Sequence, residues 1–377
     1  MSNLFLSRAP ANQGAARDIA RARALVLAHG WNATAYQILN PGILHWFSSE
    51  GDAVVGFVDH AATLVVAGAP VCPADRLLDV VREFTDAARV AGRRVCFFGA
   101  GERLEQALAP TGRWSATGLG AQPSWDPVRW PALLRRRKSV RAQLNRARNK
   151  SVRVAEWVQV DAQDRAALQR CLGEWLAGRG LPPLHFLVEP DTLGRLEDRR
   201  LFVATRAQHV VGFLVASPVP ARDGWLIEQI IRGHGAPNGT AELLVDVAMR
   251  AVAERGSRYV TLGLSPLSRH SSFDDRHTPL WLRLVLRWVR AHARRFYDFD
   301  GLDRFKAKFA PEEWENIVAL ADAPRFPPRA LWAIASAFSR GSPVGLVARA
   351  LLRAVWQEVR GLLAGTRRAL QRRRAGP

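Results

Sequence analysis

An order of secondary-structure signals that occurs twice is the feature that most constrains the fold of this chain. A pair of strand-like apolar runs, a segment with helical apolar spacing and a further apolar run appear early, and a similar order returns later with one more strand. The predicted strands are 53–59, 63–67, 95–98, 201–205, 210–216, 225–231 and 259–264, and the predicted helices are 76–91 and 240–255. This order predicts an α/β (α+β) architecture of two similar units in tandem.

The length of 377 residues is sufficient for two domains, and an apolar content of 48% with 23% charged residues is typical of a globular chain. We expect five parts, which are an N-terminal segment 1–20, a first domain 21–125, a basic linking helix 126–154, a second and catalytic domain 155–325, and an amphipathic basic tail 326–377.

The segment 129–153 carries many arginines and lysines and no acidic residue. Leu133, Leu134, Val140 and Leu144 form a thin apolar stripe, which predicts a helix. The whole chain has 54 Lys and Arg against 34 Asp and Glu, a formal net charge of +20. Such a surplus favours polyanionic partners, either nucleic acid or an anionic membrane. The basic segment is therefore either a polyanion-binding helix or a solvated helix face.

The stretch 299–311 reads FDGLDRFKAKFAP and predicts a strand or a strand-like edge. On a strand, Lys306 and Lys308 would share one face with Arg304, and Phe305 and Phe309 would point into a core. A row of cations on an apolar backing suits a phosphate or a carboxylate. The alternative is an edge strand whose lysines discourage pairing with another chain.

A glycine-rich loop at 231–240 precedes the second predicted helix. Backbone N–H groups at such a helix start can bind an anion. Glu228 lies on the strand before the loop and is a candidate base or amine-binding group, or else a salt-bridge partner of Arg232.

Two stretches have the composition of interfacial helices, with tryptophan and leucine interleaved with arginine. They are 281–295 and 331–374, and the second is the stronger candidate for membrane contact. The alternative for both is an amphipathic helix packed on a domain. No run reaches the roughly 20 apolar residues of a spanning helix.

Three scattered cysteines, Cys72, Cys96 and Cys171, indicate a reducing compartment, and the first residues do not have the pattern of a signal peptide. His270 and His277 lack helical metal-ligand spacing, so no metal is predicted. We expect a cytoplasmic protein, soluble or peripheral on a membrane.

Four blocks in order resemble the C-terminal domain of the phosphatidylglycerol lysyl- and alanyltransferases, over about residues 20 to 325. The blocks are LRRRKSVRAQLNRARNKSVRV (134–154), APNGTAELLVDVAM (236–249), LGLSPLS (262–268) and FDGLDRFKAKFAPEEW (299–314). The resemblance implies a tandem GNAT-like fold, as in the Fem-type aminoacyltransferases. It also implies transfer of an aminoacyl group from aminoacyl-tRNA to a glycerol hydroxyl of an anionic membrane lipid. No cofactor is expected beyond the aminoacyl-tRNA donor, and the enzyme would sit peripherally on the inner face of the cell membrane.

The resemblance also assigns candidate site residues. The candidate catalytic residues are Glu228, Arg232, Asp303 and Lys306, and the candidate substrate-binding residues are Gln229, Asn238, Gly239, Arg304 and Lys308. The candidate tRNA-binding residues are Arg135, Arg136, Arg137, Lys138, Arg141 and Arg146. The family carries an aspartate where this chain has Gln229, so the acid that faces the lysines is either Glu228 or Asp303.

Two other functions fit the same sequence. A GNAT acyltransferase that uses acyl-CoA is one, although Pro237 removes an N–H from the loop that would bind the pyrophosphate. A non-catalytic basic protein that binds membranes is the other.

Overall fold

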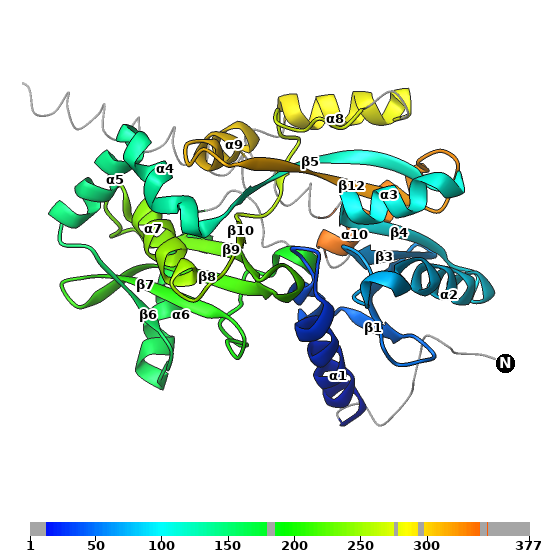
Figure 1. The fold of residues 1–377 in the computed structure, drawn as a ribbon, viewed down its shortest axis with the longest axis horizontal. Coiled ribbons are helices and arrows are strands. Elements are labelled where there is room, and N and C mark those ends of the chain that lie inside the picture. Colours follow the sequence, from blue (N-terminus) through cyan, green and yellow to red (C-terminus); the bar gives the residue numbers. More distant parts are fainter. Residues whose placement is uncertain (1–12, 179–184, 275–277, 293–297, 340–344, 346–377) are drawn as a thin grey trace, which may run out of the picture.

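A computed structural model of the chain describes residues 13–178, 185–274, 278–292, 298–339 and 345. Its described strands form one twelve-stranded mixed sheet with the order β1-β2-β3-β4-β12-β5-β10-β9-β8-β7-β6, and β11 also pairs with β5 (Figure 1). The strands are β1 Leu44–Phe47, β2 Val54–His60, β3 Thr63–Ala67, β4 Arg94–Gly101, β5 Ser115–Trp125, β6 Arg153–Trp157, β7 Arg200–Arg206, β8 His209–Val219, β9 Gly224–Arg232, β10 Tyr259–Thr261, β11 Ser265–Pro266 and β12 Glu313–Ala321.

Helices cover both faces of this sheet, and a short 3₁₀ helix η1, Tyr36–Leu39, follows the first of them. The α-helices are α1 Gln13–His29, α2 Leu77–Val90, α3 Glu102–Leu108, α4 Trp130–Arg136, α5 Lys138–Asn149, α6 Ala162–Ala177, α7 Thr240–Ala253, α8 Leu280–His292, α9 Phe299–Ala307 and α10 Pro328–Ser339. None of the described helices combines the length and the apolar content that crossing a bilayer requires.

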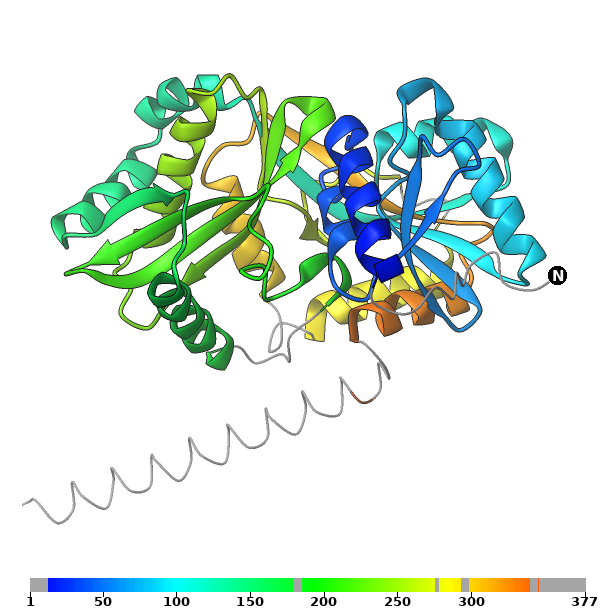
Figure 2. The same cartoon turned by 90° about the horizontal axis from the view of Figure 1, so that it is seen from below.

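Alternation along the strands supplies a core on each face of the sheet, as expected for strands that are covered on both sides. In the first half, Val55 and Phe57 of β2 pack with α2 and α3, whereas Val54 packs with α1, η1, α8 and α10. In the second half, Phe202 packs with α4, α5 and α7, and Leu201 packs with α6. In each half, the two sets of helices therefore lie on opposite faces of the sheet (Figure 2).

The predicted strands and helices of both units are present with small shifts of their ends, which confirms the α/β fold class. The proposed division into domains stays a prediction. One strand crosses the predicted boundary, because β12 belongs to the second predicted domain in sequence but lies between β4 and β5 of the first. The predicted basic helix is two helices, α4 and α5, which meet at Arg137.

The strand prediction for residues 299–311 is wrong, because this segment begins with helix α9. The Asp298 side chain accepts a hydrogen bond from the backbone N–H of Gly301 at 2.8 Å and so caps the helix. Leu302, Phe305 and Phe309 are spaced three and four apart, which is a helical period as well as part of an alternating one.

Only the start of the predicted amphipathic tail lies within the described residues. Residues 328–339 form α10, whose Ala333, Ile334 and Ala337 are buried in the first-half core. The start of the tail is therefore a helix with one face packed on the first half, and membrane contact through the tail stays a prediction. The rest of the tail lies outside the described residues, apart from residue 345.

Strand β9 pairs with β10 over only the first part of its length, and the candidate site lies where this pairing ends. It pairs with β10 only over Gly224–Leu226, although its pairing with β8 continues to Arg232. The register on β8 shifts at Glu228, which lies in a β-bulge between the paired residues Ile227 and Gln229. After β10 ends at Thr261, the chain turns at Gly263, whose φ of +70° favours glycine, and then pairs with β5 through β11.

Candidate active site

Lys306 lies in α9 and is buried, with 4% of its surface exposed. Its Nζ donates to the carbonyl oxygens of Gly263 at 2.8 Å and Leu264 at 2.9 Å, where the chain passes from β10 to β11. Burial lowers the pKa of Lys306 from 10.5 to about 7, and the nearby charge of Asp303 opposes this shift. The amine can therefore exist in both protonation states near neutral pH.

Lys308 does not share a face with Lys306, which corrects the prediction of a cation row. Residues two apart on a helix lie about 200° apart around its axis. Lys308 Nζ donates to Glu242 in the first turn of α7 and lies 3.8 Å from the centroid of the Phe305 ring. Burial lowers the pKa of Lys308, the hydrogen bond with Glu242 opposes the shift, and the charge of Arg232 adds to it. Arg232 and Lys308 are therefore electrostatic neighbours.

Asp303, a predicted catalytic residue, belongs to a polar cluster with Ser268 and His270 that the sequence analysis did not predict. The Ser268 hydroxyl donates to Asp303 Oδ1 at 2.6 Å, and His270 Nε2 lies 3.9 Å from Asp303 Oδ2. The His270 ring stacks on Trp314 with 4.2 Å between the ring centroids. Because Ser268 donates to a carboxylate, this cluster is built to hold Asp303 beside Lys306 rather than to activate a serine. Ser268 lies in the block 262–268 that supports the family resemblance, and this block was the sequence signal that could have identified Ser268 as a site residue.

Arg304 takes no part in this cluster. Its side chain is exposed, and its Nε donates to the carbonyl of Asp300 one turn earlier. The predicted position of Arg304 beside the two lysines is wrong, because the helix turns it to the solvent.

Glu228 pairs with Arg199, and not with Arg232 as the salt-bridge alternative had it. Arg199 Nε donates to Glu228 Oε1, and Gln37 Nε2 of η1 donates to Oε2 at 2.7 Å. The side chains of Arg199 and Glu228 are almost fully buried, and the Tyr36 ring lies 4.8 Å from the Arg199 guanidinium. Both carboxylate oxygens of Glu228 are thus occupied, one by Arg199 of the same half and the other by Gln37 of the first half.

Gln229 has different surroundings from Glu228. Its side-chain amide donates to the carbonyls of Glu189 and Pro190, both at 2.9 Å, and accepts from the Thr192 hydroxyl at 3.0 Å. Glu228 therefore does not occupy the place of Gln229, where the resemblance led us to expect an aspartate.

The glycine-rich loop exposes Arg232 and Asn238 and buries Gly239. Gly239 has φ of +95°, and a Cβ atom on it would lie 2.0 Å from the carbonyl oxygen of Gln143 in α5. This glycine is required for the close approach of α7 to α5, so a role in substrate binding is not needed to explain it.

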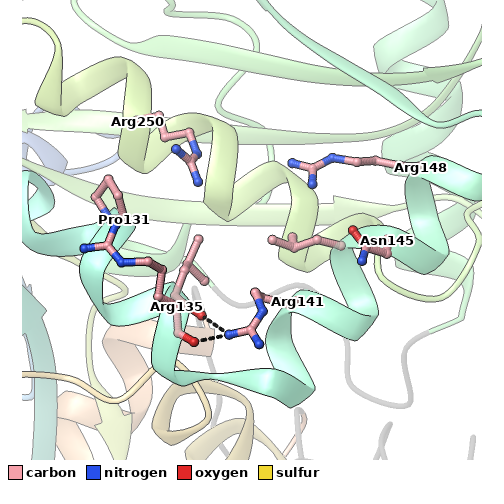
Figure 3. A pocket seen from close by; sticks show the side chains of 8 residues that line it. Pro131, Arg135, Arg141, Asn145, Arg148 and Arg250 are labelled. Atoms are coloured by element: carbon pink, nitrogen blue, oxygen red, sulfur yellow. Dashed lines mark hydrogen bonds between the residues drawn. The ribbon is translucent and has the colours of Figure 1, made fainter.

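The predicted tRNA-binding residues lie on α4 and α5. Arg135, Arg136, Arg137, Lys138 and Arg146 are exposed. Arg141 instead donates through Nη1 to the carbonyls of Leu134 and Arg135, so it caps the end of α4 (Figure 3).

A cavity of about 180 Å³ lies between α4, α5 and α7, and it is lined by Pro131, Leu134, Arg135, Arg141, Leu144, Asn145, Arg148 and Arg250 (Figure 3). Arg148 and Arg250 bind the buried carboxylate of Asp246 at 3.1 and 2.9 Å, and Asp246 also accepts from Trp130 at 3.0 Å. Arginines therefore outnumber acids at this cavity, which suits an anion.

Comparison with known proteins gives one family and one fold. The sequence profile of the family described as phosphatidylglycerol lysyltransferase, C-terminal, matches residues 23–319. The phosphatidylglycerol lysyltransferase of Bacillus subtilis (strain 168) is 24% identical over 302 residues, which are 79% of this chain and 34% of that protein. This chain thus spans about a third of that relative.

Two solved structures share the fold at 22% identity. One is the C-terminal domain of a putative lysylphosphatidylglycerol synthetase from Agrobacterium fabrum, with a TM-score of 0.73 and coverage of 87% of this chain and 98% of that chain. The other is L-PGS from Bacillus licheniformis, with a TM-score of 0.70 and coverage of 89% and 96%. The predicted resemblance and fold class are confirmed, and the predicted transferase class agrees with the family.

Replacing Lys306 with Met should flatten the pH dependence of stability above neutral pH. The unfolded chain holds a proton on Lys306 up to a pKa near 10.5, whereas the folded chain loses it near 7. Since the unfolded state binds more protons in this window, wild-type stability rises with pH between these values relative to K306M. Thermal unfolding of both proteins from pH 7 to 10 measures how the stability difference between them changes with pH. A constant difference would contradict a buried amine with a depressed pKa.

Replacing Glu228 with Gln should cost roughly 3 kcal/mol of unfolding free energy, because Arg199 would be left buried without its counter-charge. The control is Asp79→Asn, which breaks an exposed ion pair with Arg82 and should cost less than about 0.5 kcal/mol. Denaturant unfolding compares the two. If E228Q were as stable as D79N but lost all transfer activity, Glu228 would act in the chemistry instead.

Proposed function

The chain belongs to the phosphatidylglycerol lysyltransferase C-terminal family, and we propose that it transfers an aminoacyl group from aminoacyl-tRNA to a hydroxyl of phosphatidylglycerol or a similar anionic lipid. The observation that carries this proposal is the buried amine of Lys306, tuned to a pKa of about 7 beside Asp303. A group with such a pKa can accept and return a proton at neutral pH.

The hydrogen bonds of Lys306 favour a role as a general base. A neutral amine has two N–H donors and one lone pair, and the carbonyls of Gly263 and Leu264 accept both donors. The lone pair then remains to take a proton. When Lys306 is protonated, the third N–H is available to an oxyanion or a leaving group. The two carbonyls thus orient the amine in both states.

The proposed reaction is an exchange of one ester for another. The lipid hydroxyl oxygen attacks the ester carbonyl carbon of the aminoacyl-tRNA while Lys306 takes the hydroxyl proton. The tetrahedral intermediate then expels the ribose oxygen of the tRNA, which receives that proton from Lys306. Because the donor ester is already activated, positioning does most of the catalysis and no cofactor is required.

Charges around Lys306 suit the two substrates. Arg232 is exposed at the end of β9, close to Lys308 and to the N-terminus of α7, and it is the cation there that a lipid phosphate would meet, since Lys308 is paired with Glu242. The exposed arginines of α4 and α5 suit a tRNA backbone, since arginine binds phosphate through a bidentate fork. Such a protein would work peripherally on the inner face of the cell membrane.

Production of the chain in a host without aminoacylated lipids should yield a new aminoacyl lipid, detected by mass spectrometry of total lipid. Lys306→Met should remove that product. Because the variant leaves the carbonyls of Gly263 and Leu264 without their donor, its thermal unfolding is measured alongside to show that it is folded at the assay temperature. Product made undiminished by K306M would contradict the assignment of Lys306. Turnover of acyl-CoA with no new lipid would favour the acyl-CoA acyltransferase.

Replacing Arg135, Arg136 and Arg137 together with Ala should weaken tRNA binding and lower its salt dependence. If each arginine contacts one phosphate, the slope of log K against log salt falls by roughly 2 to 3. The matched control replaces Arg82, Arg89 and Arg94 with Ala, three exposed arginines of the first half that lie away from α4 and α5. Filter binding measures both variants, and equal weakening by the control would contradict a tRNA site on α4 and α5.

A further inference from the structure

Helix α8 exposes large apolar side chains on its outer face, which we define as Leu280, Leu284 and Trp288. These residues are 68%, 63% and 63% exposed, and their spacing of four places them along one side of the helix. The other side of α8 is also apolar, since Trp281, Leu282 and Leu286 pack on the first-half core. A helix that covers a core in water normally presents a polar outer face.

Charge on α8 is of one sign. Arg287 is exposed next to the outer face, and Arg283 and Arg290 are half-buried on its flanks. Arg290 forms an ion pair with Asp300, with 3.4 Å between Nη2 and Oδ1. The helix itself contains no acidic residue, and the neighbouring Asp300 carboxylate is paired with Arg290, so arginine charge prevails on the outer face.

Helix α10 extends the same surface. It packs on the same core as α8, and both helices run along the lower edge of the molecule in Figure 2. Its Trp332 is 47% exposed, Arg329 is exposed beside it, and α10 also has no acidic residue. Exposed tryptophan and leucine with flanking arginines are the residues of helices that lie in the headgroup plane of a membrane.

We propose that the outer face of α8, together with Trp332 of α10, docks on an anionic phospholipid bilayer. The leucine and tryptophan side chains enter the boundary between headgroups and acyl chains, and the arginines contact lipid phosphates. The inference deepens the proposed function, since it supplies the contact that brings the site to a membrane-embedded acceptor. A bilayer fits this surface better than a protein partner, because all the charged residues of α8 and α10 are basic and the apolar residues form a line along α8.

Co-sedimentation of the full chain with vesicles tests the docking surface. The protein should bind vesicles of phosphatidylcholine with phosphatidylglycerol and bind those of phosphatidylcholine alone at least about tenfold more weakly. The double variant L284E/W288E should lose about tenfold or more in affinity for the anionic vesicles. Arg287→Ala should lose about fivefold, which corresponds to about 1 kcal/mol for one basic residue near an anionic surface.

The matched control is V90E/V158E, which adds the same charge at two exposed apolar positions away from α8 and should lose much less than L284E/W288E. A second comparison replaces Arg372, Arg373 and Arg374 with Glu in the full chain. If that variant lost binding while L284E/W288E kept it, or if phosphatidylcholine alone bound equally well, the proposal would be overturned.

Transfer to detergent-dispersed phosphatidylglycerol separates this proposal from the proposed function. We expect L284E/W288E to keep that activity while losing vesicle binding. If wild-type protein bound anionic vesicles through α8 but made no aminoacyl lipid, the proposed function would fail and the docking surface would stand.

Discussion

The pairing of β5 with β12 is the interaction on which the arrangement of this molecule depends. β12 pairs with β5 from Ser115 to Ser124, and on its other edge it pairs with β4. The far end of β5 pairs with β10 and β11 of the second half. One long strand thus carries the hydrogen bonds of both halves, and breaking it would leave buried backbone groups without partners.

The pairing of β5 with β12 also determines where α9, the helix that carries Lys306, lies. To reach β12, the chain must return from β11 across the sheet, and α8 and α9 lie on that return. Phe309, at the end of α9, is fully buried in the second-half core, where its carbonyl accepts from Trp125 Nε1 at 3.2 Å. Phe309 thus anchors the C-terminal end of α9, where Lys306 contacts the chain just after β10.

Much of the fold could be predicted from the sequence, because the strands and helices of both units are marked by period and by turn residues. The failure at 299–311 has a physical cause. Phe305 and Phe309 are four apart, and that spacing satisfies an alternating pattern and a helical one equally well. The signal that decides for a helix is Asp298, whose side chain caps α9 from outside the stretch considered.

The sequence by itself determined the family, the two α/β units, the basic character of α4 and α5, and the identity of the residues available for chemistry. It did so because periodicity, turn residues and charge are local properties of a chain. Only the tertiary structure decided which of those residues meet. Glu228 finds Arg199 and Gln37, Lys308 finds Glu242, and Lys306 finds two backbone carbonyls. Those partners lie 29 to 191 residues away along the chain, and long-range packing alone sets such distances.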